Sequence, residues 1–163
     1  MVLIGIGNAG SDLLNEFSKS HKKIQIRKKD FPRDCITPED YENRCPDFTK
    51  KVLSDSDEYW VCMSGTSNIA SSALRILEII KNKKINIIYI YPDLTLCNSI
   101  QLKKHKVVFN VLQQYTRSGL LNRMYIISNN NILDMIGDQP INKLYKNINK
   151  QIANSIETLE WLK

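Results

Sequence analysis

The sequence predicts an α/β fold of three layers, in which a mostly parallel, Rossmann-like sheet lies between helices on both faces. Three observations lead to it. Short apolar runs alternate with segments whose apolar residues recur every three or four positions. A glycine-rich turn directly follows the first apolar run, and a long amphipathic segment, predicted as a core helix, ends the chain. We expect a single domain over residues 1–163, because a chain of this length can bury one substantial core.

The first unit of this fold is predicted as strand, helix and strand. The apolar run Val2 to Ile6 predicts the first strand, Ser11 to Lys19 the helix, and Lys23 to Arg27 the second strand. Such a unit is the opening of a βαβ fold, because the glycine turn leads the chain from the strand directly into the helix.

The middle of the chain begins with the segment Lys28 to Pro46, where prolines lie among charged residues. This predicts loops and one short helix, which begins at Pro38 and has Thr37 as its N-cap. A helix is predicted next, from about Asp47 to Leu53.

A second strand, turn and helix unit follows that helix. It consists of a buried strand at Tyr59 to Met63, a polar turn at Ser64 to Asn68 and a helix at Ile69 to Asn82, and the next strand is predicted at Asn86 to Tyr91.

The last third of the chain is predicted as helix, strand and long helix. The first helix spans Gln101 to Arg117, and the strand spans Met124 to Ile127. The inward-facing residues of the first helix are predicted to be Val107, Val108, Val111, Leu112 and Tyr115. Pro140 opens the long helix. Its periodic apolar residues predict one buried stripe, made of Ile141, Leu144, Tyr145, Ile148, Ile152, Ile156, Leu159 and Leu162.

Composition narrows the class of protein. The net charge of +6 is compatible with an anionic partner. The basic clusters lack interleaved aromatic residues, so solvated helix ends and loops are a better interpretation than a nucleic acid groove. The apolar runs are short and the N-terminus lacks the pattern of a secretion signal, so we expect a cytoplasmic protein without a membrane contact.

The cysteines point to reduced thiols rather than to a metal site. Four cysteines are scattered without a CxxC pair, and only two histidines could join them. We therefore predict no metal ligands, and we expect Cys62 and Cys97 to be partly buried.

The glycine turn after the first strand is the main candidate for a ligand site. Gly5, Gly7 and Gly10 have the GxGxxG spacing, with Asn8 between them. Glycines at this spacing let backbone amides approach a phosphate at a helix N-terminus. The turn is common to dinucleotide-binding and other phosphate-binding folds, and it therefore predicts a nucleotide without saying which.

The polar turn after the buried strand is the second candidate. Gly65 permits close approach, while the hydroxyls of Ser64, Thr66 and Ser67 can donate to a phosphate at another helix start. Both turns are expected at the carboxyl ends of parallel strands, where they could share one ligand. An NADP-binding protein is an alternative, since the place of the ribose-binding acidic residue is held by the basic run Arg27 to Lys29, which suits a 2′-phosphate.

These turns and one further block resemble the tubulin and FtsZ superfamily of GTP-binding proteins. The Gly65-Thr66 pair stands in the place of the family's second glycine-rich turn, G-G-T-G-[ST]-G. The run Ile126 to Leu133 is similar to the FtsZ run I-P-N-D-x-L-L, which ends a strand and opens a short helix. The similarity extends over most of residues 2–163 and is clear in these short blocks.

The resemblance implies where a guanine base would bind. In the family an aromatic residue on the long helix stacks on guanine, and an Asn or Asp one turn later binds its edge. The corresponding residues here are Tyr145 and Asn149, whose spacing of four places them on one helix face. By the same comparison Asn129 contacts ribose or base, and Lys106 replaces a nucleotide-contacting arginine. The implied ligand is GTP or GDP, and Mg²⁺ would be held mainly by phosphate oxygens and water.

The chain departs from the family in ways that bear on hydrolysis. The glycine-rich loop that senses the γ-phosphate is missing between Lys28 and Asp57, where Thr37 to Glu39 could be a shortened remnant. The acidic loop that activates water would begin at Lys163. The resemblance therefore implies an assembly or structural module with little or no GTP hydrolysis of its own, and no catalytic residue is assigned.

Two alternatives stay open beside it. One is a structural scaffold of the same fold without nucleotide, since the Ser64 turn has fewer glycines than the family pattern. The other is the NADP-binding protein. A protein partner or a homo-oligomer is compatible with the guanine-nucleotide module and with the scaffold. We expect Trp161 and Leu162 to be exposed at the end of the long helix, where a partner could bind.

Overall fold

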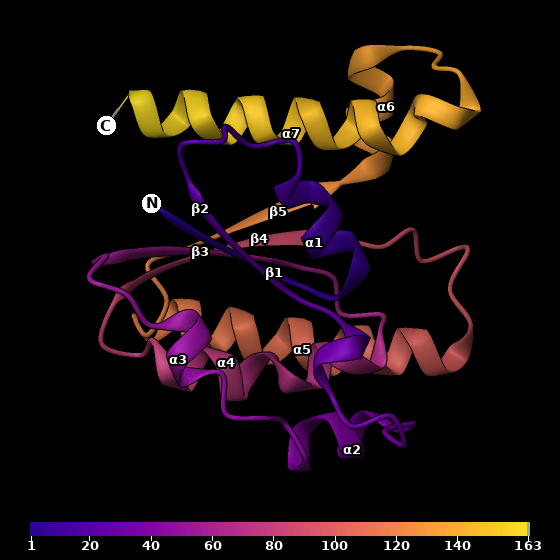
Figure 1. Ribbon diagram of the computed structural model, residues 1–163. Coiled ribbons are helices and arrows are strands. Elements are labelled where there is room, and N and C mark those ends of the chain that lie inside the picture. Colours follow the sequence, from indigo (N-terminus) through magenta and orange to yellow (C-terminus); the bar gives the residue numbers. More distant parts are fainter. Residues whose placement is uncertain (163) are drawn as a thin grey trace.

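The computed structural model describes residues 1–162 and contains one parallel sheet between two layers of helices (Figure 1). The strands are β1 (Val2–Ile6), β2 (Lys22–Ile26), β3 (Glu58–Met63), β4 (Lys84–Tyr91) and β5 (Arg123–Ser128). They lie in the order β2-β1-β3-β4-β5, and every neighbouring pair is parallel. The predicted α/β class is confirmed.

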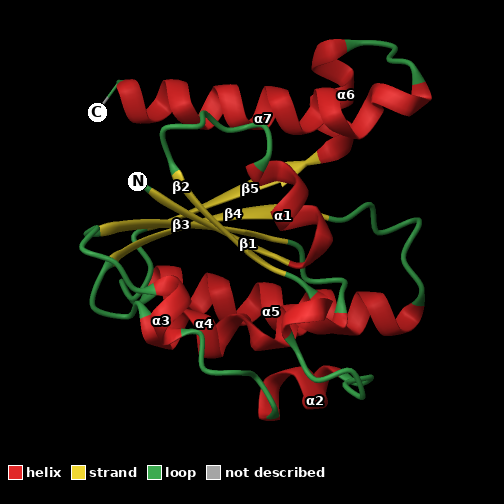
Figure 2. Ribbon diagram, viewed as in Figure 1, coloured by secondary structure: helices red, strands yellow, loops and turns green. Residues whose placement is uncertain are grey.

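Helices cover both faces of this sheet. They are α1 (Gly7–Leu14), α2 (Pro38–Asn43), α3 (Thr49–Val52), α4 (Ala73–Ile79), α5 (Ser99–Arg117), α6 (Asn129–Ile136) and α7 (Leu144–Trp161), with short 3-10 segments at Lys28–Asp30, Asn68–Ser72 and Ile141–Lys143. Figure 2 shows α1, α6 and α7 on one face and α3, α4 and α5 on the other, with α2 outside the second layer.

The strands are apolar along their whole length because both of their faces are buried. In β1, Ile4 packs into the core beneath α4 and α5, while its neighbour Leu3 packs with Trp60 and the α7 residue Ile152. Leu3 and Ile4 are both fully buried. Each such side chain contributes about 1.5–3 kcal/mol to folding, which explains runs without the polar alternation of a half-exposed strand.

Several predicted boundaries change in the structure. The helix predicted at Ser11 to Lys19 begins earlier, at Gly7, and ends at Leu14. The helix predicted at Ile69 to Asn82 begins as a 3-10 turn and becomes α-helical only at Ala73. The helix predicted from about Asp47 is a single turn, α3. The Thr37 cap is confirmed, since Thr37 Oγ1 accepts from the amide of Asp40.

Two predictions of buried residues were wrong. Val107 is 64% exposed, because α5 turns only part of its surface to the sheet. The stripe of α7 is buried only in its middle, at Ile148, Ile152 and Ile156. Its other members are partly or largely exposed, namely Ile141, Leu144, Tyr145, Leu159 and Leu162. A helix of 18 residues is about 27 Å long and extends beyond the surface that α1 and the sheet offer it.

The end of the long helix is exposed, whereas the cysteines are buried to different degrees. Trp161 and Leu162 are exposed, as predicted, and Lys163 lies outside the described residues. Cys62 is fully buried and Cys97 half-buried, and the cysteines are free thiols. No helix within residues 1–162 is long and apolar enough to cross a membrane.

Candidate functional site

The strand order places a crevice at the carboxyl ends of β1 and β3. From β1 the chain crosses to β2 on one side, and β3 returns to pair with β1 on the other side. Ligands of open α/β sheets bind at such a reversal of strand order. Ile6 is opposite Met63 in the register, so Gly7 and Ser64 leave adjacent strands at the same level. The prediction that both turns meet at one edge is confirmed.

A cavity of about 420 Å³ lies between these two turns. Its wall combines backbone at the start of α1, the polar turn after β3 and two side chains from the segment after β2. The lining residues are Ile6, Gly7, Asn8, Ala9, Lys28, Tyr41, Ser64, Thr66, Ser67, Asn68 and Ile69. None of these side chains is a carboxylate, so the charge that the described wall supplies is positive.

The first turn presents backbone amides to this cavity. Gly7 is the first residue of α1 and has a φ of +74°, which residues with a side chain rarely adopt. A Cβ at Gly7 would lie 3.1 Å from Ile69 Cγ2 and 3.4 Å from Ser67 Oγ, across the cavity. No side chain caps α1 and its first turn has no acidic residue, so its first N–H groups and its positive dipole end are available to an anion.

The other two glycines of the motif serve packing instead. A Cβ at Gly5 would lie 2.7 Å from backbone atoms of Gly10, and a Cβ at Gly10 would collide with the carbonyl of Cys62. Gly5 and Gly10 therefore let α1 approach β1 and β3 to backbone contact. They shape the turn from behind and do not line the cavity.

The second turn faces the cavity with hydroxyls and rests on buried aromatic residues. The hydroxyls of Ser64 and Thr66 lie 3.4 Å apart. Gly65 is buried, and its amide donates to the hydroxyl of Tyr89, which lies 2.8 Å from His105 Nδ1. Burial raises the pKa of Tyr89. The Gly65 amide is thus bonded to the core. The groups of this turn that can bind a ligand belong to Ser64, Thr66 and Ser67.

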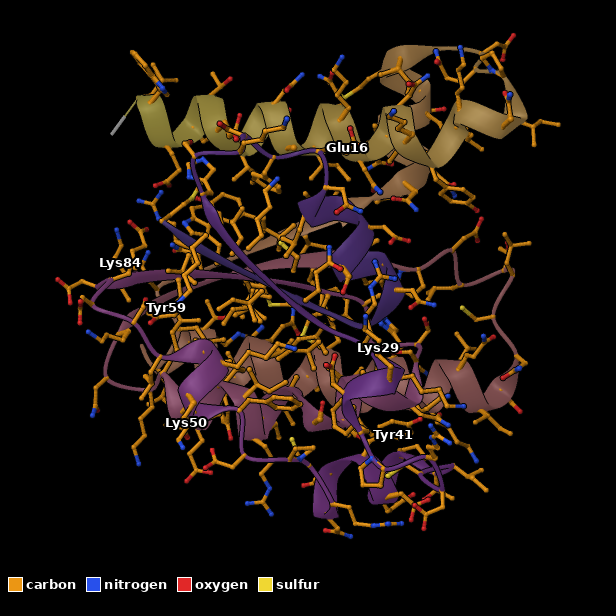
Figure 3. The ribbon with its side chains drawn as sticks, in the orientation of Figure 1. Glu16, Lys29, Tyr41, Lys50, Tyr59 and Lys84 are labelled. Carbon is orange, nitrogen blue, oxygen red and sulfur yellow. The ribbon has the colours of Figure 1, made fainter. Side chains whose placement is uncertain are left out.

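The segment after β2 supplies two lining residues that the sequence analysis did not single out as a pair. Lys28 lies two residues after the end of β2, directly after Arg27, and Tyr41 comes from α2. Figure 3 shows Tyr41 on the side of the sheet that carries α4 and α5. Arg27 is engaged beside the cavity, where its guanidinium is 2.7 Å from Asp12 and 3.5 Å from Asn8 Oδ1. The basic run after the second strand was the only sequence signal for Lys28, and Tyr41 had none.

A lysine of α5, Lys104, reaches the second turn. Lys104 Nζ donates to Asn68 Oδ1 at 2.6 Å, and Asn68 Nδ2 donates to the carbonyl of Ile36. Lys106 is exposed two residues further along α5 and is outside the cavity wall. The link through Asn68 ties α5 and the loop before α2 to the polar turn.

The residues predicted to hold a guanine base lie apart from the cavity wall. Asn129 begins α6 directly after β5, which is two strands from β3, about 10 Å along the sheet. Tyr145 is in the first turn of α7 and is 69% exposed, with Asn149 one turn later. Figure 1 shows α7 beginning on the side of the molecule where the strands end. A nucleotide with its phosphates in the cavity and its base at these residues would extend across the ends of β4 and β5.

Neither a family model nor a curated protein matches the chain. Within residues 1–162, no group of three His, Cys, Asp or Glu side chains could hold a metal ion.

Proposed function

We propose that this protein binds the phosphate groups of a nucleotide in the cavity between the turns after β1 and β3. The observation that carries the proposal is the wall of that cavity, where the uncapped start of α1 faces hydroxyls and a lysine at the reversal of strand order.

The chemistry of the wall favours an anion. Amides at the start of α1 and the hydroxyls of Ser64, Thr66 and Ser67 can all donate hydrogen bonds, while Lys28 supplies a full positive charge. A phosphate can accept from several such donors at once. The described wall has no carboxylate that would repel it.

We propose a guanine nucleotide as the ligand, on the basis of the resemblance to tubulin and FtsZ. GTP or GDP would place its phosphates in the cavity and its base toward Tyr145 and Asn149. An exposed aromatic ring can stack on a base without first losing core contacts, and Tyr145 is such a ring. Mg²⁺ would be held mainly by phosphate oxygens and water.

We propose a binding or assembly module rather than an efficient GTPase. The described cavity wall contains no carboxylate or imidazole within it that could take a proton from an attacking water. A nucleotide-free scaffold is the outcome if no ligand binds.

NADP is the second candidate, because Lys28 lines the cavity and Arg27 lies beside it at the end of β2. In dinucleotide-binding folds this position meets the ribose, and cations there accommodate a 2′-phosphate. Arg27 already has Asp12 as its partner, so Lys28 is the cation available to the ligand.

The test is calorimetric titration with GDP, GTP and NADP, in the presence of Mg²⁺ and after removal of any copurified nucleotide. At a ligand concentration of about 100 Kd, binding should stabilise the fold by about 2.7 kcal/mol and raise Tm by roughly 5–10 °C. Lys28→Glu should weaken binding at least about tenfold by reversing the charge in the wall. Its matched control is Lys29→Glu, an exposed neighbour outside the wall, which should bind like the wild type.

A second variant separates the two nucleotides. Tyr145→Ala removes the proposed stacking ring from an exposed position, so the fold should keep its stability while guanine binding falls about tenfold or more. NADP binding should not change. Equal loss in Lys28→Glu and Lys29→Glu, or no binding of any nucleotide by the wild type, would contradict the cavity as the site.

A further inference from the structure

The two edges of the sheet are protected very differently. The β2 edge carries Lys22 and Lys23, and Lys51 Nζ donates to the carbonyl of Gln25 at 2.9 Å. Charged side chains and covered carbonyls are the usual means by which edge strands avoid pairing with other chains. The β2 edge is therefore guarded.

The β5 edge lacks such protection. β5 pairs only with β4, so its other side presents backbone N–H and C=O groups without a strand partner. Its sequence, Arg123-Met124-Tyr125-Ile126-Ile127-Ser128, has a charge only at the first position and no proline. Ile126 is 51% exposed although it lies in the middle of the strand.

We propose that a second copy of this chain docks on this edge, with the two β5 strands antiparallel about a twofold axis at Ile126. The ten strands would then form one continuous sheet. The proposal rests on β5 and not on the nucleotide cavity.

The side chains of β5 select this register. Met124 packs into the core on the α5 side, whereas Tyr125 and Ile127 pack into the core on the α7 side. A twofold axis perpendicular to the sheet keeps each face on its own side, so only residues of the same face can be opposite each other. With Ile126 opposite its own copy, Tyr125 lies opposite Ile127, and the exposed Ile126 side chains cover each other.

In this register the cation at the start of β5 comes toward a carboxylate in the loop after β4. Arg123 comes opposite Asn129, the residue before Asn130, whose Nδ2 is 3.1 Å from Asp93 Oδ2. Hydrogen bonds from Thr95 and Asn130 lower the pKa of Asp93, so it is ionised at neutral pH. The twofold axis brings each exposed Arg123 toward the Asp93 of the other copy. This complementarity favours a second copy over an unrelated strand.

The first test is sedimentation velocity between about 1 µM and 1 mM, the range of weak to moderate association. The wild type should dimerise, and Ile126→Lys should raise the dissociation constant about 100-fold by placing two ammonium groups opposite each other. Its control is Leu159→Lys on α7, where the wild-type side chain is 44% exposed, close to the value for Ile126. A monomeric wild type, or loss of the dimer in Leu159→Lys alone, overturns the proposal.

The second test fixes the register by disulfide formation. Antiparallel neighbours have Cα atoms about 4.5–5.5 Å apart, within the reach of a disulfide. Under mild oxidation Ile126→Cys should therefore form a covalent dimer through its own copy. In Ser128→Cys the two thiols would be four positions apart, about 13 Å, and should not crosslink. Crosslinking of Ser128→Cys in preference to Ile126→Cys contradicts the register.

Discussion

The turn after β1 and the turn after β3 meet in one cavity, but glycine has a different task in each. In the first turn, Gly5 and Gly10 bring the backbone of α1 against β1 and β3, and Gly7 alone faces the cavity. In the second turn, Gly65 points inward to Tyr89, and the residues on either side of it face the cavity. The spacing of Gly5 and Gly10 is therefore explained by the close packing of α1 on the strands. The groups available to a ligand are the backbone at Gly7 and the hydroxyls of the second turn.

The largest effect that tests this comparison is expected at Gly10. In Gly10→Ala the new Cβ would overlap the backbone of Cys62, which cannot move without displacing β3. We expect a loss of about 3 kcal/mol or more in the free energy of unfolding, measured by urea denaturation. Gly119→Ala is the control: Gly119 has a φ of +81° but open space around its Cβ position, so its cost should be limited to about 1 kcal/mol of backbone strain.

In the second turn, a substitution of glycine should clash first with a side chain, that of Tyr89, and not with the backbone of a strand. In Gly65→Ala the Cβ would overlap the hydroxyl of Tyr89, whose ring is fully buried beside Phe109. We expect a loss of about 2 kcal/mol in unfolding free energy. Tyr89→Phe removes the nearest obstacle, the hydroxyl, but leaves His105 Cα at 3.2 Å and Tyr89 Cζ at 3.3 Å from the Cβ position. The double variant should therefore lose less than the sum of the two single variants.

A double-mutant cycle measured by urea denaturation distinguishes this explanation from a general strain in the turn. Additive losses would mean that the Gly65 backbone itself, and not its contact with Tyr89, requires glycine. The same cycle with Tyr91→Phe, on the same strand, provides the matched control. The Tyr91 ring packs against His105 and Phe109, but its hydroxyl is not among the atoms that Gly65 meets.

The parts of the fold that depend on local pattern could be predicted from the sequence. The apolar runs at Val2 to Ile6 and Tyr59 to Met63 are strands because both of their faces are buried, and burial of both faces is visible in the sequence as an unbroken apolar run. Thr37 and Pro38 predicted a helix start correctly because capping involves only neighbouring residues.

The parts that depend on long-range packing could not. The exposure of Val107 and of the ends of the α7 stripe depends on how far neighbouring elements extend, which periodicity does not encode. Tyr41 reaches the cavity through the path of a loop, and Lys104 rather than Lys106 reaches Asn68 because of the rotation of α5. The glycine motif located the site, but its wall includes residues that no spacing in the sequence brings together.

A smaller effect is expected at Ser67, on ligand binding alone. Ser67 is exposed and its hydroxyl faces Gly7 across the cavity. In Ser67→Ala we expect nucleotide affinity to fall about tenfold, the value of one hydrogen bond to a charged group, with no change in unfolding free energy. Ser71→Ala is the control. Ser71 is outside the cavity wall, and its hydroxyl donates to the carbonyls of Pro38 and Asn68, so that variant should lose stability and keep its affinity.

The smallest effect concerns the support of the second turn at low pH. Burial, and secondly the charge of Lys106, lower the pKa of His105 below its usual value of 6.5. When neutral His105 carries its proton on Nε2, its Nδ1 accepts from the Tyr89 hydroxyl at 2.8 Å, and that hydroxyl accepts from the Gly65 amide. Protonation of Nδ1 would remove that acceptor and leave the Tyr89 proton without a partner in this chain of hydrogen bonds.

The sign of the pH dependence follows from where the proton binds. Below pH 6.5 the unfolded chain takes up a proton at His105 before the folded protein does, so stability is complete above pH 6.5 and declines as the pH falls toward the lowered pKa. Urea midpoints measured across this range should show the decline in the wild type and in His21→Gln, whose wild-type imidazole lies 3.3 Å from Glu157 at a different site. In His105→Gln the decline should be smaller, because glutamine can accept from Tyr89 without titrating. An unchanged slope in that variant would mean that the second turn is insensitive to His105, and that Tyr89 alone supports Gly65.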